Sequence, residues 1–203
     1  MKHYATPAAL LGLAAACLSS CADQKETPEP LPEPTATYRR TWAYLDQALP
    51  ARRDSTYQTA ALAPTAEQNA TSLFVFLRTK PNEEGLLFSI NRNRLTPGLT
   101  GTYTYRTPLD FTTTDVDLKY YVFYKRTINS SASWDYGSFV NRQLTGSFTI
   151  TAYDAKRQLL SGKFDARVPN ASDPTDTDNT PNPRRCEITL AGSFANLSIT
   201  ARQ

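Results

Sequence analysis

The last third of this chain alternates apolar and polar residues with a period of two, and this pattern restricts the fold more than any other feature of the sequence. In Phe148–Ala152 and in Leu160–Val168, the apolar side chains fall on one face of an extended strand and the polar ones on the other. The short polar segment Asp154–Arg157 separates the two runs, which therefore predict a β-hairpin. Helical spacing is not sustained anywhere after Tyr38, so we expect an all-β fold.

The final strand makes two further predictions. Cys186, Ile188 and Leu190 share one face, so we expect Cys186 to be a buried and unreactive thiol. Beyond Phe194 the apolar residues change face. This change requires one inserted residue near Asn196, most simply a β-bulge.

Six more segments are expected as strands, which brings the total to nine: Arg39–Leu45, Thr56–Leu62, Ser72–Thr79, Leu86–Asn91, Gly101–Arg106 and Leu118–Arg126. Nine short strands with polar loops predict a single antiparallel β-sandwich or barrel-like domain. Glycines are followed two positions later by an aromatic residue at Gly101, Gly137, Gly146, Gly162 and Gly192. Same-face rings can cover the gap that a strand glycine leaves, so we interpret the repeat as a packing device.

The N-terminal segment indicates export from the cytoplasm. The apolar run Ala8–Leu18 is shorter than the roughly 20 residues that a transmembrane helix needs. It leads into Leu18-Ser19-Ser20-Cys21, which resembles a bacterial lipobox. The resemblance implies a signal peptide over residues 1–20 and a palmitate-bearing lipoprotein anchored through Cys21. An ordinary secretory leader is the alternative. Because Ala22 is not the Asp that resembles an inner-membrane retention signal, we expect the outer membrane of the cell envelope.

Residues 21–37 form the next segment and contain prolines at alternate positions from Pro28 to Pro34. Such a stretch favours an extended polyproline-like spacer. We therefore expect a lipidated, proline-rich tether that leads into an all-β domain over residues 38–203.

Residue counts exclude several kinds of catalysis. The only histidine is His3, in the expected signal peptide, so Ser-His-Asp and Cys-His chemistry and histidine-bearing zinc sites are excluded. No glycine-rich phosphate loop occurs, and no cofactor is expected. A glycoside hydrolase would need two carboxylates across a cleft, but the glutamates of the domain are expected in loops or on a polar strand face: Glu67, Glu83, Glu84 and Glu187. We therefore expect a protein that is not an enzyme.

Aromatic residues outside the core are the best candidates for ligand binding. In the strand Leu118–Arg126, Tyr121 and Phe123 should face outward while their neighbours face the core. The alternative is a central strand with both faces covered. Trp134 and Tyr136 lie in a segment that is expected to be a polar loop, Asn129–Ser138, where they contact either a ligand or the core.

Two weaker candidates concern charged groups. Asp173, Asp176 and Asp178 could offer oxygen ligands to Ca²⁺, but the EF-hand spacing is missing and a solvated acidic loop is favoured, so no metal site is expected. Three arginine pairs could bind an anionic patch, although a solvated surface is the default: Arg39 with Arg40, Arg52 with Arg53, and Arg184 with Arg185. Nucleic acid is not expected as a partner.

The segments TGSFTITAYDAKRQLLSGKFDARV (residues 145–168) and ITLAGSFANLSI (residues 188–199) resemble the C-terminal signature of small uncharacterised lipoproteins from Bacteroidota. The resemblance implies an all-β fold and no particular activity. Together these patterns predict an envelope-anchored lipoprotein that binds a glycan or a protein partner without catalysis. A structural or accessory subunit of an envelope complex is the alternative, and a carboxylate-based glycoside hydrolase is a remote one.

Overall fold

A computed structural model describes residues 29–45, 51–80, 83–105, 115–127, 130–137, 144–176 and 184–202. The all-β prediction is confirmed, because these residues form strands and two short 3₁₀ turns. The strands are β1 (Thr35–Tyr44), β2 (Arg52–Tyr57), β3 (Leu62–Gln68), β4 (Ser72–Thr79), β5 (Glu84–Asn91), β6 (Gly101–Thr104), β7 (Val116–Thr127), β8 (Ser130–Gly137), β9 (Thr145–Asp154), β10 (Leu159–Ser172) and β11 (Arg185–Ala201).

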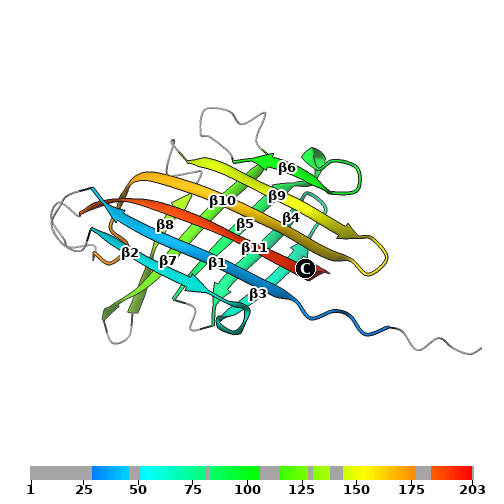
Figure 1. The fold of residues 1–203 in the computed structure, drawn as a ribbon, viewed down its shortest axis with the longest axis horizontal. Helices are drawn as coiled ribbons and strands as arrows, with labels where there is room; N and C mark the ends of the chain where they lie inside the picture. Colours follow the sequence, from blue (N-terminus) through cyan, green and yellow to red (C-terminus); the bar gives the residue numbers. More distant parts are fainter. Residues whose placement is uncertain are drawn as a thin grey trace, which may run out of the picture. The chain divides into compact units, whose positions relative to one another are not determined.

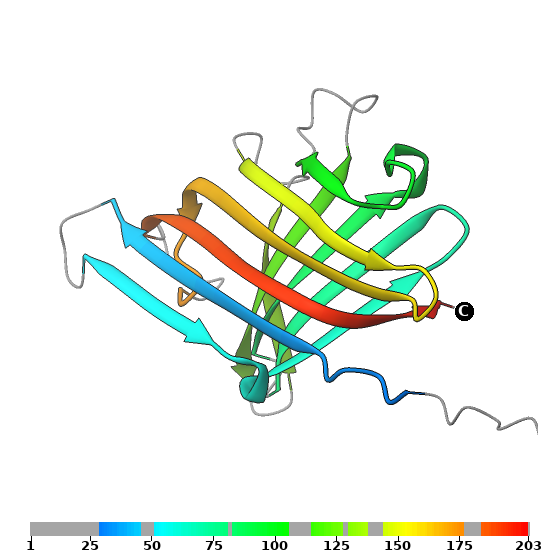
Figure 2. The ribbon, with the colours of Figure 1, turned by 45° about the vertical axis from the view of Figure 1, so that its right-hand side comes forward.

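The strands of the β domain form one curled, barrel-like sheet with two halves. One half has the order β2-β1-β11-β10-β9-β6, and the other has the order β3-β4-β5-β7-β8. The strands of the first half cross in front of those of the second, and the turned view shows the curl (Figures 1 and 2). The halves meet where the end of β11 pairs in parallel with β3, at Ile199 and Ala66, and at a bridge between Tyr105 and Val116.

A single apolar core lies between the two halves. It is rich in aromatic rings. The ring centroid of Phe88 in β5 lies 4.7 Å from that of Phe148 and 4.9 Å from that of Phe164, both in the opposite half. Ile188 and Cys186 of β11 are fully buried in the same core. The predicted burial of the only free cysteine that the structure describes is therefore confirmed.

The predicted hairpin and bulge are both present. β9 and β10 are joined by a turn in which the Asp154 carboxylate accepts hydrogen bonds from the backbone N–H groups of Lys156 and Arg157. Along β10 and β11 the register steps from Leu160–Leu197 to Gly162–Phe194, so β11 carries one extra residue. Asn196 takes a positive φ of 58° at this bulge.

The glycine and aromatic residues act as reciprocal pairs across β10 and β11. Gly162 is paired with Phe194, and Phe164 is paired with Gly192. A Cβ atom added to Gly162 would lie 2.5 Å from the Phe194 ring, and one added to Gly192 would lie 2.7 Å from the Phe164 ring. The rings thus occupy the space that these two glycines leave open, but each ring covers the glycine of the neighbouring strand rather than the one two positions before it.

Two strands differ from the prediction. The expected strand Thr56–Leu62 is interrupted by a 3₁₀ turn at Thr59–Ala61, which separates β2 from β3. The expected loop Asn129–Ser138 instead contains β8, which pairs along β7. β8 does alternate, because Ala132, Trp134 and Tyr136 are separated by polar residues, but its many serines led to the prediction of a loop.

Candidate functional site

A hollow of about 220 Å³ lies on the outer face of the β4-β5-β7-β8 half, away from the core. The strand register explains how its residues come together, because paired residues of antiparallel strands share a face. Arg78 is paired with Gly85, Gly85 with Tyr121, and Tyr121 with Asp135, so one row crosses four strands. The hollow is lined by Phe76, Arg78, Leu87, Lys119, Tyr121, Phe123, Ser133 and Asp135.

Gly85 determines how the Tyr121 ring lies. A Cβ atom at Gly85 would be 2.4 Å from the Tyr121 hydroxyl oxygen, so the ring reaches across β5 over the space where a side chain would stand. The Phe123 ring packs against Tyr121 edge-on, with 5.0 Å between centroids and 70° between planes. Phe123 remains 38% exposed. Two rings of different tilt therefore form one wall of the hollow.

Charged groups surround the aromatic wall. Lys119 Nζ forms an ion pair with Asp135 at 3.1 Å. The Arg78 guanidinium lies 5.9 Å from the centroid of the Phe76 ring, within the range of a cation–π contact. Burial raises the pKa of Tyr121, and the charge of Arg78 acts in the opposite direction. The phenol therefore stays protonated at neutral pH and can donate a hydrogen bond.

The hollow can bind a ring-shaped group through the rings and hydrogen-bond its substituents at the rim. Its volume is below the roughly 300–1,000 Å³ typical of pockets that enclose a whole drug-sized ligand. The arrangement therefore suits one ring of a larger molecule rather than an enclosed substrate.

Of the four predicted binding residues, Tyr121 and Phe123 face outward from the core as expected. Tyr136 does not join them: it is buried, pairs with Tyr120, and donates a hydrogen bond to the carbonyl of Ser172 at 2.6 Å. Its prediction as a loop residue is wrong because β8 turns it toward the core. The backbone of Trp134 lies in β8 opposite Val122, and its side chain is outside the described part of the structure.

The acidic segment before β11 is not a fully solvated loop. Asp173 is completely buried, and its carboxylate accepts hydrogen bonds from Arg184 at 2.5 Å and from Thr175. Asp176 accepts one from the backbone N–H of Arg184 at 2.9 Å. The two carboxylates thus bind Arg184, the residue that precedes β11. Asp178 and Cys21 lie outside the described residues.

The sequence did not reveal a polar cluster inside the domain. Arg40 and Glu84 are both buried, which corrects the expectation of a solvated arginine pair and of glutamates on a polar face. Their side chains form an ion pair at 3.4 Å between β1 and β5. Tyr120 donates a hydrogen bond to the same Glu84 oxygen at 2.6 Å. The signal was the alternation in β1, where Arg40 falls on the same face as Tyr38 and Trp42.

Burial raises a tyrosine pKa in this cluster and leaves polar atoms in and near it without hydrogen bonds. The pKa of Tyr120 is well above its usual value because of desolvation and the nearby Glu84 charge. The Arg40 guanidinium lies 3.7 Å from the centroid of the Trp42 ring. Five buried polar atoms in the described part of the chain complete no hydrogen bond: Tyr38 Oη, Arg40 Nε, Trp42 Nε1, Tyr44 Oη and Glu84 Oε1.

No protein-family model matches this chain, and no curated protein matches it either. Over the residues that the structure describes, no helix has both the length and the apolar character needed to span a membrane. Any assignment of function therefore depends on the residues themselves.

Proposed function

We propose that this protein is an envelope lipoprotein, anchored through Cys21, that binds a saccharide in the outer-face hollow without catalysis. A sugar ring offers an apolar face of C–H groups that can pack on an aromatic ring, and hydroxyl groups that need hydrogen-bond partners at its edge. The hollow offers both kinds of contact within one row of paired residues.

The observation that carries the proposal is the aromatic wall made by Tyr121 and Phe123. Large apolar rings on the outer face of a sheet lower the solubility of a protein. Contiguous apolar patches of this kind commonly mark binding sites. Here the rim also carries Arg78, Lys119 and Asp135, which are groups that hydrogen-bond hydroxyls.

Titration of the detergent-solubilised full chain with cellohexaose, maltohexaose, xylohexaose and polygalacturonate oligomers, followed by calorimetry, tests the proposal. We expect at least one saccharide to bind, and both Tyr121→Ala and Phe123→Ala to weaken that binding about tenfold or more, since burial of a large apolar side chain contributes roughly 1.5–3 kcal/mol. Exposed substitutions cost little stability, so the melting temperature of Phe123→Ala should change little.

Phe74→Ala is the matched control. Phe74 lies on the same face of β4, stacked 6.2 Å from Phe76, but does not line the hollow. Its loss should leave saccharide binding unchanged. Equal weakening by Phe74→Ala and Phe123→Ala, or binding of no saccharide at all, contradicts the proposal.

The anchor has its own test. Cys21→Ser should leave the leader unprocessed and abolish incorporation of labelled palmitate, because the thiol is the point of acylation in lipoproteins of this pattern. Persistent labelling would contradict the lipoprotein assignment while leaving the saccharide site unaffected.

A further inference from the structure

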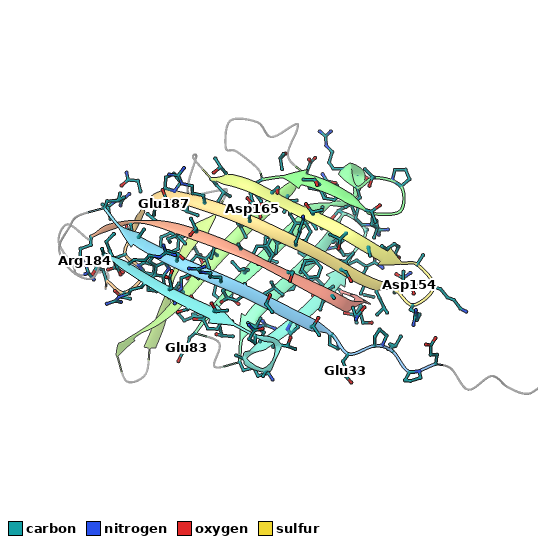
Figure 3. All side chains as sticks on the ribbon, viewed as in Figure 1. Glu33, Glu83, Asp154, Asp165, Arg184 and Glu187 are labelled. Atoms are coloured by element: carbon teal, nitrogen blue, oxygen red, sulfur yellow. The ribbon has the colours of Figure 1, made fainter. Side chains whose placement is uncertain are left out.

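Two of the three arginine pairs meet at one end of the domain, although more than 120 residues separate them in the sequence. Arg53 is in the edge strand β2, paired with Trp42 of β1, and Arg184 precedes β11. Both guanidiniums approach the ring of Tyr44, the last residue of β1, with Cζ atoms 5.9 Å and 4.8 Å from its centroid. Figure 3 shows Arg184 at the end of the domain opposite to Glu33.

The two guanidiniums at the Tyr44 ring differ in their partners. Arg184 is neutralised by the buried Asp173 at 2.5 Å. Arg52, the neighbour of Arg53, faces the other side of β2 and pairs with Asp54 at 2.9 Å. Among the described residues no carboxylate pairs with Arg53. Within the described part of the chain, Arg53 is therefore a cation at the Tyr44 ring without a carboxylate partner.

Unused hydrogen-bond donors lie beside this cation. Trp42 and Tyr44 are 5% and 8% exposed, and neither the Trp42 Nε1 nor the Tyr44 Oη completes a hydrogen bond. Desolvation raises the pKa of Tyr44, and the neighbouring Asp173 carboxylate raises it further, although the Tyr44 hydroxyl does not complete a hydrogen bond of normal geometry. Buried donors without partners are destabilising, so an acceptor at this position would be favoured.

We infer that this end of the domain is an anion site for a phosphate group, formed by Arg53 and Arg184 with the Tyr44 hydroxyl and the Trp42 indole N–H as further donors. A guanidinium offers five N–H donors. Arg184 donates to Asp173 through one guanidinium nitrogen, Nη2, so its other N–H groups are available to a second anion. Arg53 is half-exposed on an edge strand, which gives a phosphate group access from solvent. These four donor groups favour a tetrahedral oxyanion, which accepts several hydrogen bonds at once, over chloride.

Isothermal titration of the detergent-solubilised full chain with inorganic phosphate, at constant ionic strength set by sodium chloride, tests this inference. We expect saturable binding that Arg53→Gln weakens about tenfold or more, because a hydrogen bond to a charged group contributes roughly this factor. Arg52→Gln is the matched control, since it removes the same charge one residue away on the other face and should leave binding within about twofold. Tyr44→Phe, which removes only the hydroxyl, should weaken binding by a smaller factor.

A parallel titration with glycerophosphoglycerol distinguishes the source of the phosphate. Binding of this diester as tight as that of inorganic phosphate identifies a lipid headgroup, and preference for inorganic phosphate identifies a free phosphate or monoester.

Arg53→Lys is the control for a folding defect in Arg53→Gln. It keeps the positive charge, so it should bind phosphate more tightly than Arg53→Gln does. Absence of phosphate binding, or equal losses in Arg52→Gln and Arg53→Gln, overturns the inference. The site is independent of the saccharide hollow, so Phe123→Ala should bind phosphate normally.

Discussion

Breaking the buried ion pair between Arg40 and Glu84 should be among the most damaging single changes in the domain. The two side chains are 9% and 5% exposed, and they join β1 of one half of the sheet to β5 of the other. Glu84→Gln removes the charge but keeps an oxygen that can accept the hydrogen bond from Tyr120. The Arg40 cation is then left in the interior without a counter-ion.

The expected loss is about 3–5 kcal/mol, the range found when one partner of a buried pair is removed. Arg40→Met should cost a similar amount because it leaves Glu84 unpaired. The double variant should cost clearly less than the sum of the two, since replacing both charges together leaves no isolated ion. In a domain of this size, 3 kcal/mol corresponds to a fall in melting temperature of roughly 6–12 °C.

Urea unfolding followed by circular dichroism measures these free energies, and an unchanged m-value shows that the denatured state is comparable. The surface pair Arg167–Glu187, at 2.5 Å with Arg167 60% exposed, is the control. Arg167→Met should cost much less than Glu84→Gln, because solvent screens this exposed pair. Additive losses in the Arg40 and Glu84 cycle, or a cost of Glu84→Gln below that of Arg167→Met, would refute the reasoning.

Three further predictions concern other parts of the domain. Burial raises the pKa of Cys186 to about 12, so the native protein should react with a thiol reagent only at the rate at which it unfolds, and faster labelling would contradict the burial. The pKa values of Tyr38 and Tyr120 are also raised by burial, so the stability present below pH 10 should fall as the pH rises further, with phenolate absorbance at 295 nm appearing together with loss of the circular dichroism signal. Ionisation before unfolding would show that these phenols are accessible. Gly85→Ala should displace the Tyr121 ring and impair saccharide binding with little loss of stability in urea unfolding, because the added methyl group meets only side-chain atoms on the outer face; an unchanged affinity would mean that this ring does not form the wall.

The sequence predicted those parts of the fold whose side chains alternate. The hairpin of β9 and β10 and the bulge at Asn196 follow from apolar periodicity, because one face of these strands is buried in the core. β8 carries the same signal, because Ala132, Trp134 and Tyr136 alternate with polar residues and Trp and Tyr favour strands. The strand was missed because its serines are typical of a loop, whereas the pairing with β7 shows that the alternation was the better guide.

Strand alternation likewise predicted some features of the candidate sites and not others. The outward position of Tyr121 and Phe123 follows from strand alternation alone, whereas the hollow between them and Arg78 depends on the register of β4, β5 and β7. The buried state of Arg40 was missed because an arginine is assigned to the surface by default. Its position on the inner face of β1 was visible in the sequence, but its counter-ion, Glu84, lies 44 residues away and becomes apparent only in three dimensions.

The position of β1 has a mechanical consequence. Residues before Thr35 lead directly into this strand, which is hydrogen-bonded to β11 on one side along its full length and to β2 on the other. Antiparallel hydrogen bonds lie perpendicular to the strand, so a pull from the N-terminal side along the axis of β1 loads the whole ladder in shear rather than opening one bond after another. If the chain is tethered by its N-terminal segment, drag on the domain would be resisted by all these bonds at once, and the attachment point would be among the last parts of the domain to yield.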